Sequence, residues 1–360
     1  MIFFRKFLPK IIVSASIIIF LFIAPFTVFS KLNVLNYSLN KEYKLDYFGV
    51  LNLWNVDTFE GGSVSRTVFL EKRALEFEKK NKGVYICVQN ISLQQLKLNL
   101  NNNKKPDLIT FGLGVQDEFC DQIIDFQSSY GVRDDLLMSS KIDGKIKAIP
   151  IMLGGYTLIF NKEKVNEGEM LSKLNEENLI FSSSQSINPL LSLFVNNIMP
   201  KKQEVEKLDS FDAYGKFINE KYNILLGTQR DFYRCRNREN NLKMQCEYNT
   251  LGGFSDLIQF VSIFKTDKKT EEMCTKFVEF LTSETVQCKL ENISMFPVIN
   301  KNIYTDEFYK KYNEVLLKPL KTVNVFLKQE ILDNLKELVN DYIFNGKISN
   351  KAEILKYLNN

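Results

Sequence analysis

The chain has 360 residues, of which 45% are hydrophobic and 25% charged, a composition typical of a globular protein. The formal net charge of +4 is small for this length and gives no argument for a nucleic-acid partner. The sequence contains no histidine, which excludes Ser-His and Cys-His nucleophile systems and removes the commonest general base.

The N-terminus carries the pattern of an export signal. Three basic residues, the last of them Lys10, precede an uncharged run from Ile11 to Phe29. The basic residues are expected to stay on the cytoplasmic side, which sends the rest of the chain outward. The run is about long enough to span a bilayer and ends without a clear small-x-small cleavage site. Residues 1–30 are therefore interpreted as a signal peptide or an uncleaved membrane anchor, with a buried core helix as the alternative.

After a spacer at 31–47, strand and helix patterns alternate. The expected elements are a strand at 49–54, a helix at about 65–80, a strand at 84–88, a helix at 93–100 and a strand at 106–111. In the first helix Leu70, Ala74 and Phe77 form one apolar stripe. This order predicts a parallel sheet, in which ligands bind outside the carboxyl ends of the strands, here the loops at 55–63 and 111–116.

The second half of the chain has a more mixed pattern. A strand-like run at 151–160 is broken by Gly154 and Gly155, and residues 162–222 are expected to be largely helical. Further elements are expected as strands at 223–228 and 260–264, helices around 273–280 and 331–342, and a final short helix capped by Ser349 or Asn350. The roughly 330 residues after the export signal exceed what one core usually organises, so two lobes are expected.

Six cysteines are present, without a C-x-x-C pair. The spacing of Cys235 and Cys246 allows a disulfide that closes a short loop, and it equally allows two thiols. No set of ligands has zinc-like spacing, so neither a metal site nor a cofactor is expected.

Four segments together resemble bacterial extracellular solute-binding proteins, the ligand-capturing subunits of ABC importers. They are Leu53-Trp-Asn-Val-Asp-Thr-Phe-Glu-Gly-Gly62 with the helix at 73–79, Pro106-Asp-Leu-Ile-Thr110, the stretch 148–162 and Gly227-Thr-Gln-Arg-Asp231. They are most similar to the sugar-binding branch that includes maltose-binding protein. Two features depart from this branch: no lipid-acceptor cysteine follows the export signal, and Trp54 is the only tryptophan.

The resemblance implies an α/β, two-lobed, class II periplasmic-binding-protein-like fold. Each lobe would be a mixed, mostly parallel sheet flanked by helices, and a hinge would join the lobes. Lobe 1 would comprise 48–150 and about 257–295, and lobe 2 would comprise 151–256 and about 296–360. The chain would cross between the lobes near 148–152, 256–262 and 293–300.

Several candidate ligand-binding residues have a structural alternative. Gly61 and Gly62 let backbone N–H groups approach a ligand at a helix N-terminus, or they belong to an ordinary turn capped by Ser63 or Ser65. Trp54 is either a stacking surface for a sugar or a core residue.

Other candidates are polar or lie near the expected hinge. Asp57 and Glu60 accept hydrogen bonds from sugar hydroxyls or lie in solvent. Tyr156 offers a ring and a hydroxyl to the cleft or packs within a strand. Arg230 holds a ligand oxygen, or it pairs with Asp231 or Glu247. The full predicted ligand-binding set is Trp54, Asp57, Glu60, Gly61, Gly62, Ser63, Thr110, Phe111, Gly155, Tyr156, Gln185, Thr228, Arg230 and Phe232.

These features predict an exported solute-binding protein that captures a small ligand, a sugar or oligosaccharide, and delivers it to an ABC permease. The expected protein is a monomer at the outer face of the cytoplasmic membrane or in the cell envelope, anchored or secreted, and it is not an enzyme. One alternative is a membrane-anchored sensor or structural protein on the same scaffold. A glycosidase is the weaker alternative, because Asp57 and Glu60 share one loop whereas such enzymes need carboxyls on both sides of the substrate bond.

Overall fold

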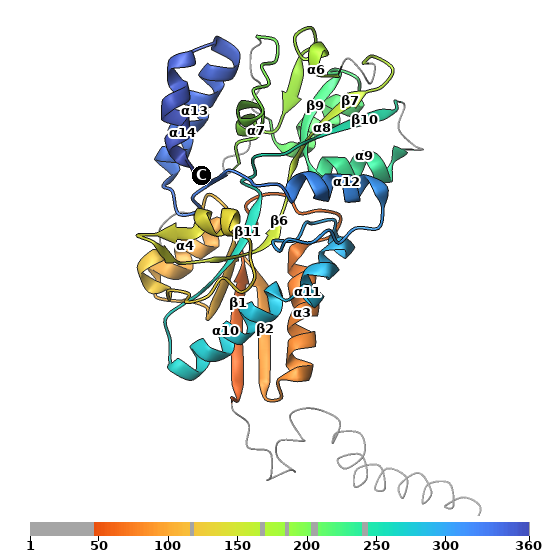
Figure 1. Cartoon of the computed structure of the whole chain (residues 1–360). Helices are drawn as coiled ribbons and strands as arrows, with labels where there is room; N and C mark the ends of the chain where they lie inside the picture. Colours follow the sequence, from red (N-terminus) through yellow and green to blue (C-terminus); the bar gives the residue numbers. More distant parts are fainter. Residues whose placement is uncertain are drawn as a thin grey trace, which may run out of the picture.

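A computed structural model describes residues 47–115, 119–165, 170–183, 187–202, 208–239 and 244–359. The predicted export signal and nearly all of the spacer therefore lie outside the described residues. Two lobes are visible, each built on its own β-sheet (Figure 1). Within the described part of the chain, no helix is both long and apolar enough to cross a membrane.

The sheet of the first lobe has five strands in the order β2-β1-β3-β11-β6. Their bounds are β1 Gly49–Asn55, β2 Val84–Asn90, β3 Leu108–Phe111, β6 Ile149–Leu153 and β11 Ile258–Ile263. β1 pairs in parallel with β2 and β3, and β11 is antiparallel to both β3 and β6. One strand therefore opposes the other four, so the sheet is mixed, as predicted.

Helices α3 Arg66–Lys80 and α4 Leu93–Asn101 connect the first three strands, as the sequence predicts. α3 buries one face, which includes Leu70, Ala74 and Phe77. Phe77 meets Phe277 of α10 Lys268–Thr282 edge to face, with ring centroids 5.1 Å apart. The short helices α5 Asp134–Leu137 and α11 Glu284–Gln287 and the two-stranded β4 Lys141–Ile142 and β5 Lys145–Ile146 complete this lobe.

The chain passes from the first sheet to the second at Gly154 and Gly155, between β6 and β7 Tyr156–Asn161. A Cβ on Gly154 would lie 2.6 Å from the side chain of Gln229, and one on Gly155 would lie 2.9 Å from Leu316. Both positions are too crowded for a side chain. The two glycines therefore mark the crossing rather than an interruption within one strand.

The sheet of the second lobe has the order β10-β7-β9-β8, with β8 Leu179–Phe181, β9 Ile224–Thr228 and β10 Cys246–Leu251. β7 opposes its two neighbours, and β8 and β9 are parallel. The expectation that residues 162–222 are largely helical is wrong for the described residues. That stretch holds β8 and only three short helices, α6 Met170–Lys173, α7 Leu190–Val195 and α8 Ser210–Ile218.

The C-terminal segment lies against both lobes. α12 Glu307–Leu316 lies near β10 of the second sheet. The chain then meets the first lobe, where Val325 N–H donates to the Ser139 carbonyl at 2.8 Å. It returns as α13 Gln329–Asn345 and α14 Lys351–Tyr357, which lie beside α7 in Figure 1. Tyr342 of α13 meets Phe194 of α7, with ring centroids 5.0 Å apart. The strands β12 Thr322–Val323 and β13 Leu358–Asn359 pair at the end of this path.

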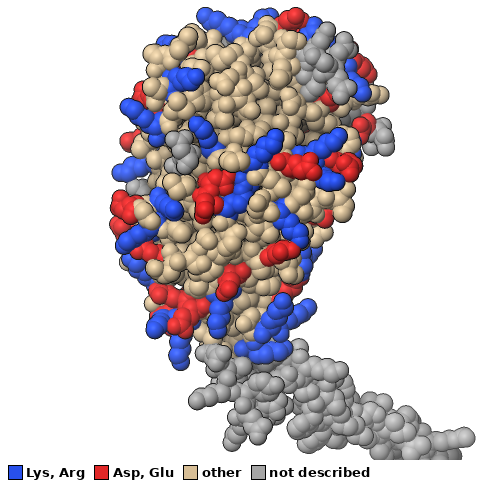
Figure 2. Space-filling view, viewed as in Figure 1, with Lys and Arg blue, Asp and Glu red and all other residues tan. Residues whose placement is uncertain are grey.

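The face of the molecule in Figure 2 carries acidic and basic side chains interspersed with uncharged ones. This face has no extended patch of one sign of charge. A strong electrostatic attraction to a polyanion would need such a patch.

Candidate functional site

A cavity of about 580 Å³ lies where the two lobes meet. The first lobe contributes the loop between β1 and α3, residues 57–65, and the second lobe contributes Ser182, Ile187, Asp209, Ser210, Thr228 and Arg230. Ser182 follows β8 and Thr228 ends β9, so these residues lie at the carboxyl end of a parallel strand pair. The loop likewise follows the carboxyl end of β1, where ligands bind in sheets of this kind.

The first-lobe loop begins on a buried polar network. Asn55, the last residue of β1, is fully buried, and its Oδ1 accepts from Thr110 Oγ1 at 2.8 Å and from Gln259 Nε2 at 3.0 Å. These bonds join the ends of β1, β3 and β11. Because each buried polar group has a partner, the network fixes where the loop leaves the sheet.

Arg66 holds the loop from inside. Its side chain is 1% exposed, and its guanidinium donates to Asp57 at 2.8 Å, to Gln259 at 2.8 Å and to the Phe59 carbonyl. It also lies 4.0 Å from the centroid of the Phe59 ring. Burial lowers the pKa of Arg66, and the Asp57 carboxylate opposes that shift. Asp57 is thus a structural partner of Arg66 as well as part of the cavity wall.

Gly62 packs the loop against the segment after α11. A Cβ at this position would lie 2.0 Å from the Ile293 carbonyl oxygen, which no side chain can occupy. The next residue, Ser63, donates its N–H to the same oxygen at 2.8 Å. Glycine is therefore required here for close approach between two backbones.

On the second lobe, α9 Gln229–Asn237 begins at the cavity with a capping box. Thr228 is the N-cap, its N–H donates to Asp231 Oδ2 at 3.0 Å, and its Oγ1 accepts from Arg230 N–H at 3.2 Å. Burial raises the pKa of Asp231 to about 6. Burial alone would lower the pKa of Arg234, but the carboxylates of Asp231 and Glu60 more than reverse this and raise it.

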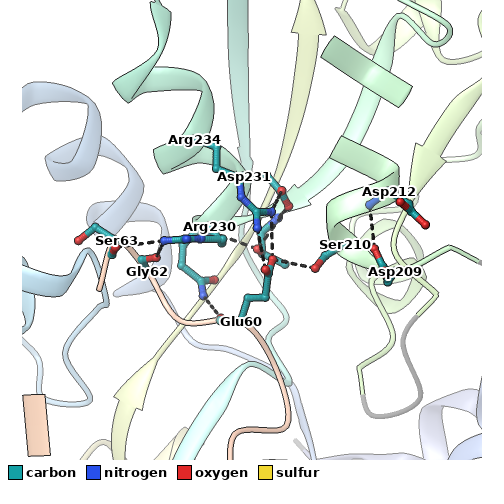
Figure 3. Close-up of polar contacts among 11 residues, drawn as sticks. Glu60, Gly62, Ser63, Asp209, Ser210, Asp212, Arg230, Asp231 and Arg234 are labelled. Carbon is teal, nitrogen blue, oxygen red and sulfur yellow. Dashed lines mark hydrogen bonds and ion pairs between the residues drawn. The ribbon is translucent and has the colours of Figure 1, made fainter. Parts of the chain in front are cut away.

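Polar contacts join the two lobes across this cavity (Figure 3). Glu60 of the first lobe meets Arg234 of the second at 2.7 and 3.1 Å and accepts from Ser210 Oγ at 2.7 Å. In the opposite direction, Arg230 donates to the carbonyls of Gly62 and Ser63 at 2.6 and 3.1 Å.

A second cavity of about 650 Å³ shares Ser182 and Ile187 with the first. Its other lining residues are Phe181, Ser183, Asn188, Pro189 and Leu190 around β8 and α7, with Asp333, Lys336, Glu337 and Asn340 on α13. Ser182 Oγ and Asn188 Nδ2 are buried and have no hydrogen-bond partner among the residues that the structure describes. These two donors can each bind an acceptor atom that enters the cavity.

Comparison with solved structures shows the same architecture. The maltodextrin-binding protein MalE1 from L. casei is 13% identical with a TM-score of 0.59, covering 86% of this chain and 97% of that one. The sugar-binding protein MalE from Xanthomonas citri is 14% identical with a TM-score of 0.58, covering 86% and 96%. The GacH receptor of Streptomyces glaucescens is also 14% identical with a TM-score of 0.58, covering 86% and 97%.

The chain has the maltodextrin-binding-protein fold. The predicted two-lobed α/β architecture, and the resemblance that implied it, are confirmed at the level of the fold. No model of a protein family matches the sequence, and no curated protein matches it.

In this maltodextrin-binding-protein fold, half of the predicted ligand-binding residues line the first cavity. They are Asp57, Glu60, Gly61, Gly62, Ser63, Thr228 and Arg230. Gln185 lies outside the described residues. The structure places the other predicted residues, Trp54, Thr110, Phe111, Gly155, Tyr156 and Phe232, away from the walls of both cavities.

Four of these residues, Trp54, Phe111, Tyr156 and Phe232, pack in the interior. Phe111 is fully buried against Phe119, with ring centroids 5.2 Å apart, and Phe232 is 4.8 Å from Tyr248. Tyr156 is also fully buried, and its hydroxyl donates to Asp256 at 2.6 Å beside the crossing. Trp54 is only 8% exposed and belongs to the core. Of the alternatives considered for Trp54 and Tyr156, the structure shows the packed arrangement.

Several lining residues have no recognisable signal in the sequence. Ser182 follows a strand of only three residues, too short to have a pattern of its own, and Ser210 begins a short helix. The polar run at 182–188 is the local signal for this part of the site, and from it only Gln185 was predicted to bind ligand. Lys336 and Asn340 reach the second cavity only because α13 folds back onto α7, which no local pattern predicts.

Proposed function

We propose that this protein is an extracytoplasmic solute-binding protein that captures a hydroxyl-rich ligand, a sugar or oligosaccharide, between its lobes. The observation that carries the proposal is the buried Ser182 Oγ, which has no hydrogen-bond partner among the described residues and lines the cavity at the lobe junction. Asn188 Nδ2, which also has no partner there, lines the adjoining cavity between β8, α7 and α13. A buried donor without a hydrogen-bond partner destabilises the folded protein, and a hydrogen bond to a ligand hydroxyl would offset that loss.

The fold supports the sugar class. Among the neighbours, the GacH receptor was solved in complex with acarbose and a cyclo/maltodextrin-binding protein with maltotetraose. The cavity walls of this protein are rich in hydroxyl, amide and carboxylate groups, which suit a polyol. Binding energy would favour the closed arrangement of the lobes over the open one.

Delivery to an ABC permease and tethering by the N-terminal hydrophobic segment complete the proposal. An importer needs its ligand-capturing subunit at the outer face of the membrane, which is where the export signal would place this chain. The carboxylates of Asp57 and Glu60 lie on one wall of the cavity and each is bonded to an arginine, an arrangement that favours binding over glycosidase chemistry.

Isothermal calorimetry of the full chain tests this function, with maltotetraose, acarbose, monosaccharides, polyols, amino acids and peptides as probes. We expect heat of binding with at least one saccharide, together with compaction of the protein in X-ray scattering. Absence of both signals for every probe would overturn the transport function.

A further inference from the structure

Glu60 belongs to the first lobe, but its carboxylate lies within the second. The distances are 2.7 Å from Oε1 to Arg234 and 2.7 Å from Oε2 to Ser210 Oγ. Figure 3 shows the side chain reaching from its loop toward α8 and α9. Gln229 also crosses the junction, because its Nε2 donates to the Glu60 carbonyl at 3.0 Å.

The receiving side is built independently of Glu60. Arg234 is held within the second lobe by Asp231 at 3.0 Å, and its guanidinium lies 5.3 Å from the ring centroid of Tyr214. Asp231 is itself fixed by the cap of α9. Ser210 starts α8, where Asp209 is the N-cap. Arg234 and Ser210, which bind the Glu60 carboxylate, are therefore held in place without contact between the lobes.

The approaching side is equally built within its own lobe. The carbonyl of Phe59 accepts from the buried Arg66, and Gly62 rests against the Ile293 backbone. These contacts fix the residues on both sides of Glu60. Since both halves are preformed, their association loses little conformational entropy.

We infer that Glu60 is a positioning residue for lobe closure: its bonds to Arg234 and Ser210 stabilise the closed arrangement and slow ligand release. Bidentate, charge-assisted bonds between arginine and carboxylate are both strong and directional. The Glu60 side chain is 35% exposed and that of Arg234 is 12% exposed, so solvent screens part of the attraction between them. The role in ligand release rests on the proposed function, whereas the effect on closure does not.

The test measures lobe closure without added ligand. Dyes on azido side chains at the exposed positions Asn102 of the first lobe and Lys221 of the second report the interlobe distance by single-molecule energy transfer. Glu60→Ala in the full chain is expected to lower the ratio of closed to open molecules about tenfold. Ser210→Ala, which removes one of the bonds, is expected to give a smaller decrease.

Glu239→Ala is the matched control. Glu239 follows the end of α9 and pairs with Arg236 of that helix at 2.7 Å, so this change also removes an arginine partner but leaves the lobe junction intact. High salt should lower the closed fraction of the unmutated protein and leave that of Glu60→Ala nearly unchanged, because only the former has the pair to screen. Circular dichroism confirms that each variant is folded.

Identical closed fractions in the unmutated protein, Glu60→Ala and Glu239→Ala would overturn the inference. So would equal salt dependence with and without Glu60. If calorimetry identifies maltotetraose as a ligand, its dissociation from Glu60→Ala should be about tenfold faster. If no probe binds, the proposed function fails, but the energy-transfer result still decides whether Glu60 closes the lobes.

Discussion

Ser182 and Ser183 are neighbours with opposite hydrogen bonding. Ser183 Oγ accepts from Leu208 N–H at 2.8 Å and donates to the Leu208 carbonyl at 3.2 Å. Ser182 Oγ is buried at the shared wall of the two cavities without a partner. A hydroxyl that makes no internal hydrogen bond contributes little to folding. Under the proposed function, Ser182 Oγ would bind the ligand from its place in the cavity wall.

Ser182→Ala is therefore expected to leave the melting temperature unchanged or slightly higher and to weaken binding of a ligand found by calorimetry about tenfold. Ser183→Ala should instead lower the melting temperature, because it breaks two internal bonds. Scanning calorimetry with titration of both variants measures the effects. A loss of stability in Ser182→Ala as large as that in Ser183→Ala would contradict the binding role.

Gly61 and Gly62 also differ despite their adjacency. A Cβ on Gly61 would have its nearest neighbour at 3.4 Å, whereas one on Gly62 would lie 2.0 Å from a backbone oxygen. Gly62→Ala should lower the free energy of unfolding by about 3 kcal/mol, since the loop must move away from Ile293. Gly61→Ala should change it by less than about 0.5 kcal/mol. Denaturant unfolding measures both, and equal effects would show that the close approach is not maintained in solution.

At the scale of elements, Cys235 of α9 and Cys246 of β10 bring these two elements into contact. Both are thiols in the structure; Cys235 belongs to the small buried apolar cluster of the second lobe, and the partly buried Cys246 packs against it. The two side chains are hydrogen-bonded, and this contact raises the pKa of Cys235 and lowers that of Cys246. The disulfide that the sequence allowed is thus compatible with the fold, although the structure does not contain it.

Treatment of the protein with diamide, a thiol oxidant, is expected to join these two cysteines. The thiols lose two protons and two electrons, and diamide is reduced to its hydrazine. Closing so short a loop should stabilise the second lobe by roughly 3 kcal/mol. Mass spectrometry of peptides locates the bond, and Cys235→Ala should abolish the stabilisation. A bond elsewhere, for example at the buried Cys274, would refute this pairing.

The elements differ in how well the sequence predicted them. α3 and α13 have long apolar stripes and were recognised because burial of one helical face repeats every three to four residues. β8 has only three residues, and β10 is half-buried with no alternation, so neither has a local signature. They are strands because β9 and β7 provide hydrogen-bonding edges, which is a tertiary effect.

At the scale of the whole molecule, one apolar cluster runs through both lobes. It includes Leu51 and Leu108 of the first sheet together with Leu158, Phe160 and Leu226 of the second. Lobes that share a core should unfold together.

Scanning calorimetry is therefore expected to show a single transition, with the calorimetric and van't Hoff enthalpies nearly equal. A saccharide found by the binding screen should raise the midpoint temperature of this transition. At a free ligand concentration of a hundred times Kd, the stabilisation is about 2.7 kcal/mol. Two separate transitions would show instead that the junction contributes little to folding.

The sequence by itself determined the export signal pattern, the β-α-β-α-β order of the first lobe and the loop after β1 that lines the cavity, because these depend on local periodicity and on turn chemistry. Only the tertiary structure decided that Phe111 and Tyr156 pack in the interior. It also decided that Ser182 and α13 line the second cavity and that Glu60 reaches Arg234. Those contacts join residues far apart in the chain. Their geometry depends on how the two sheets meet, which no local pattern records.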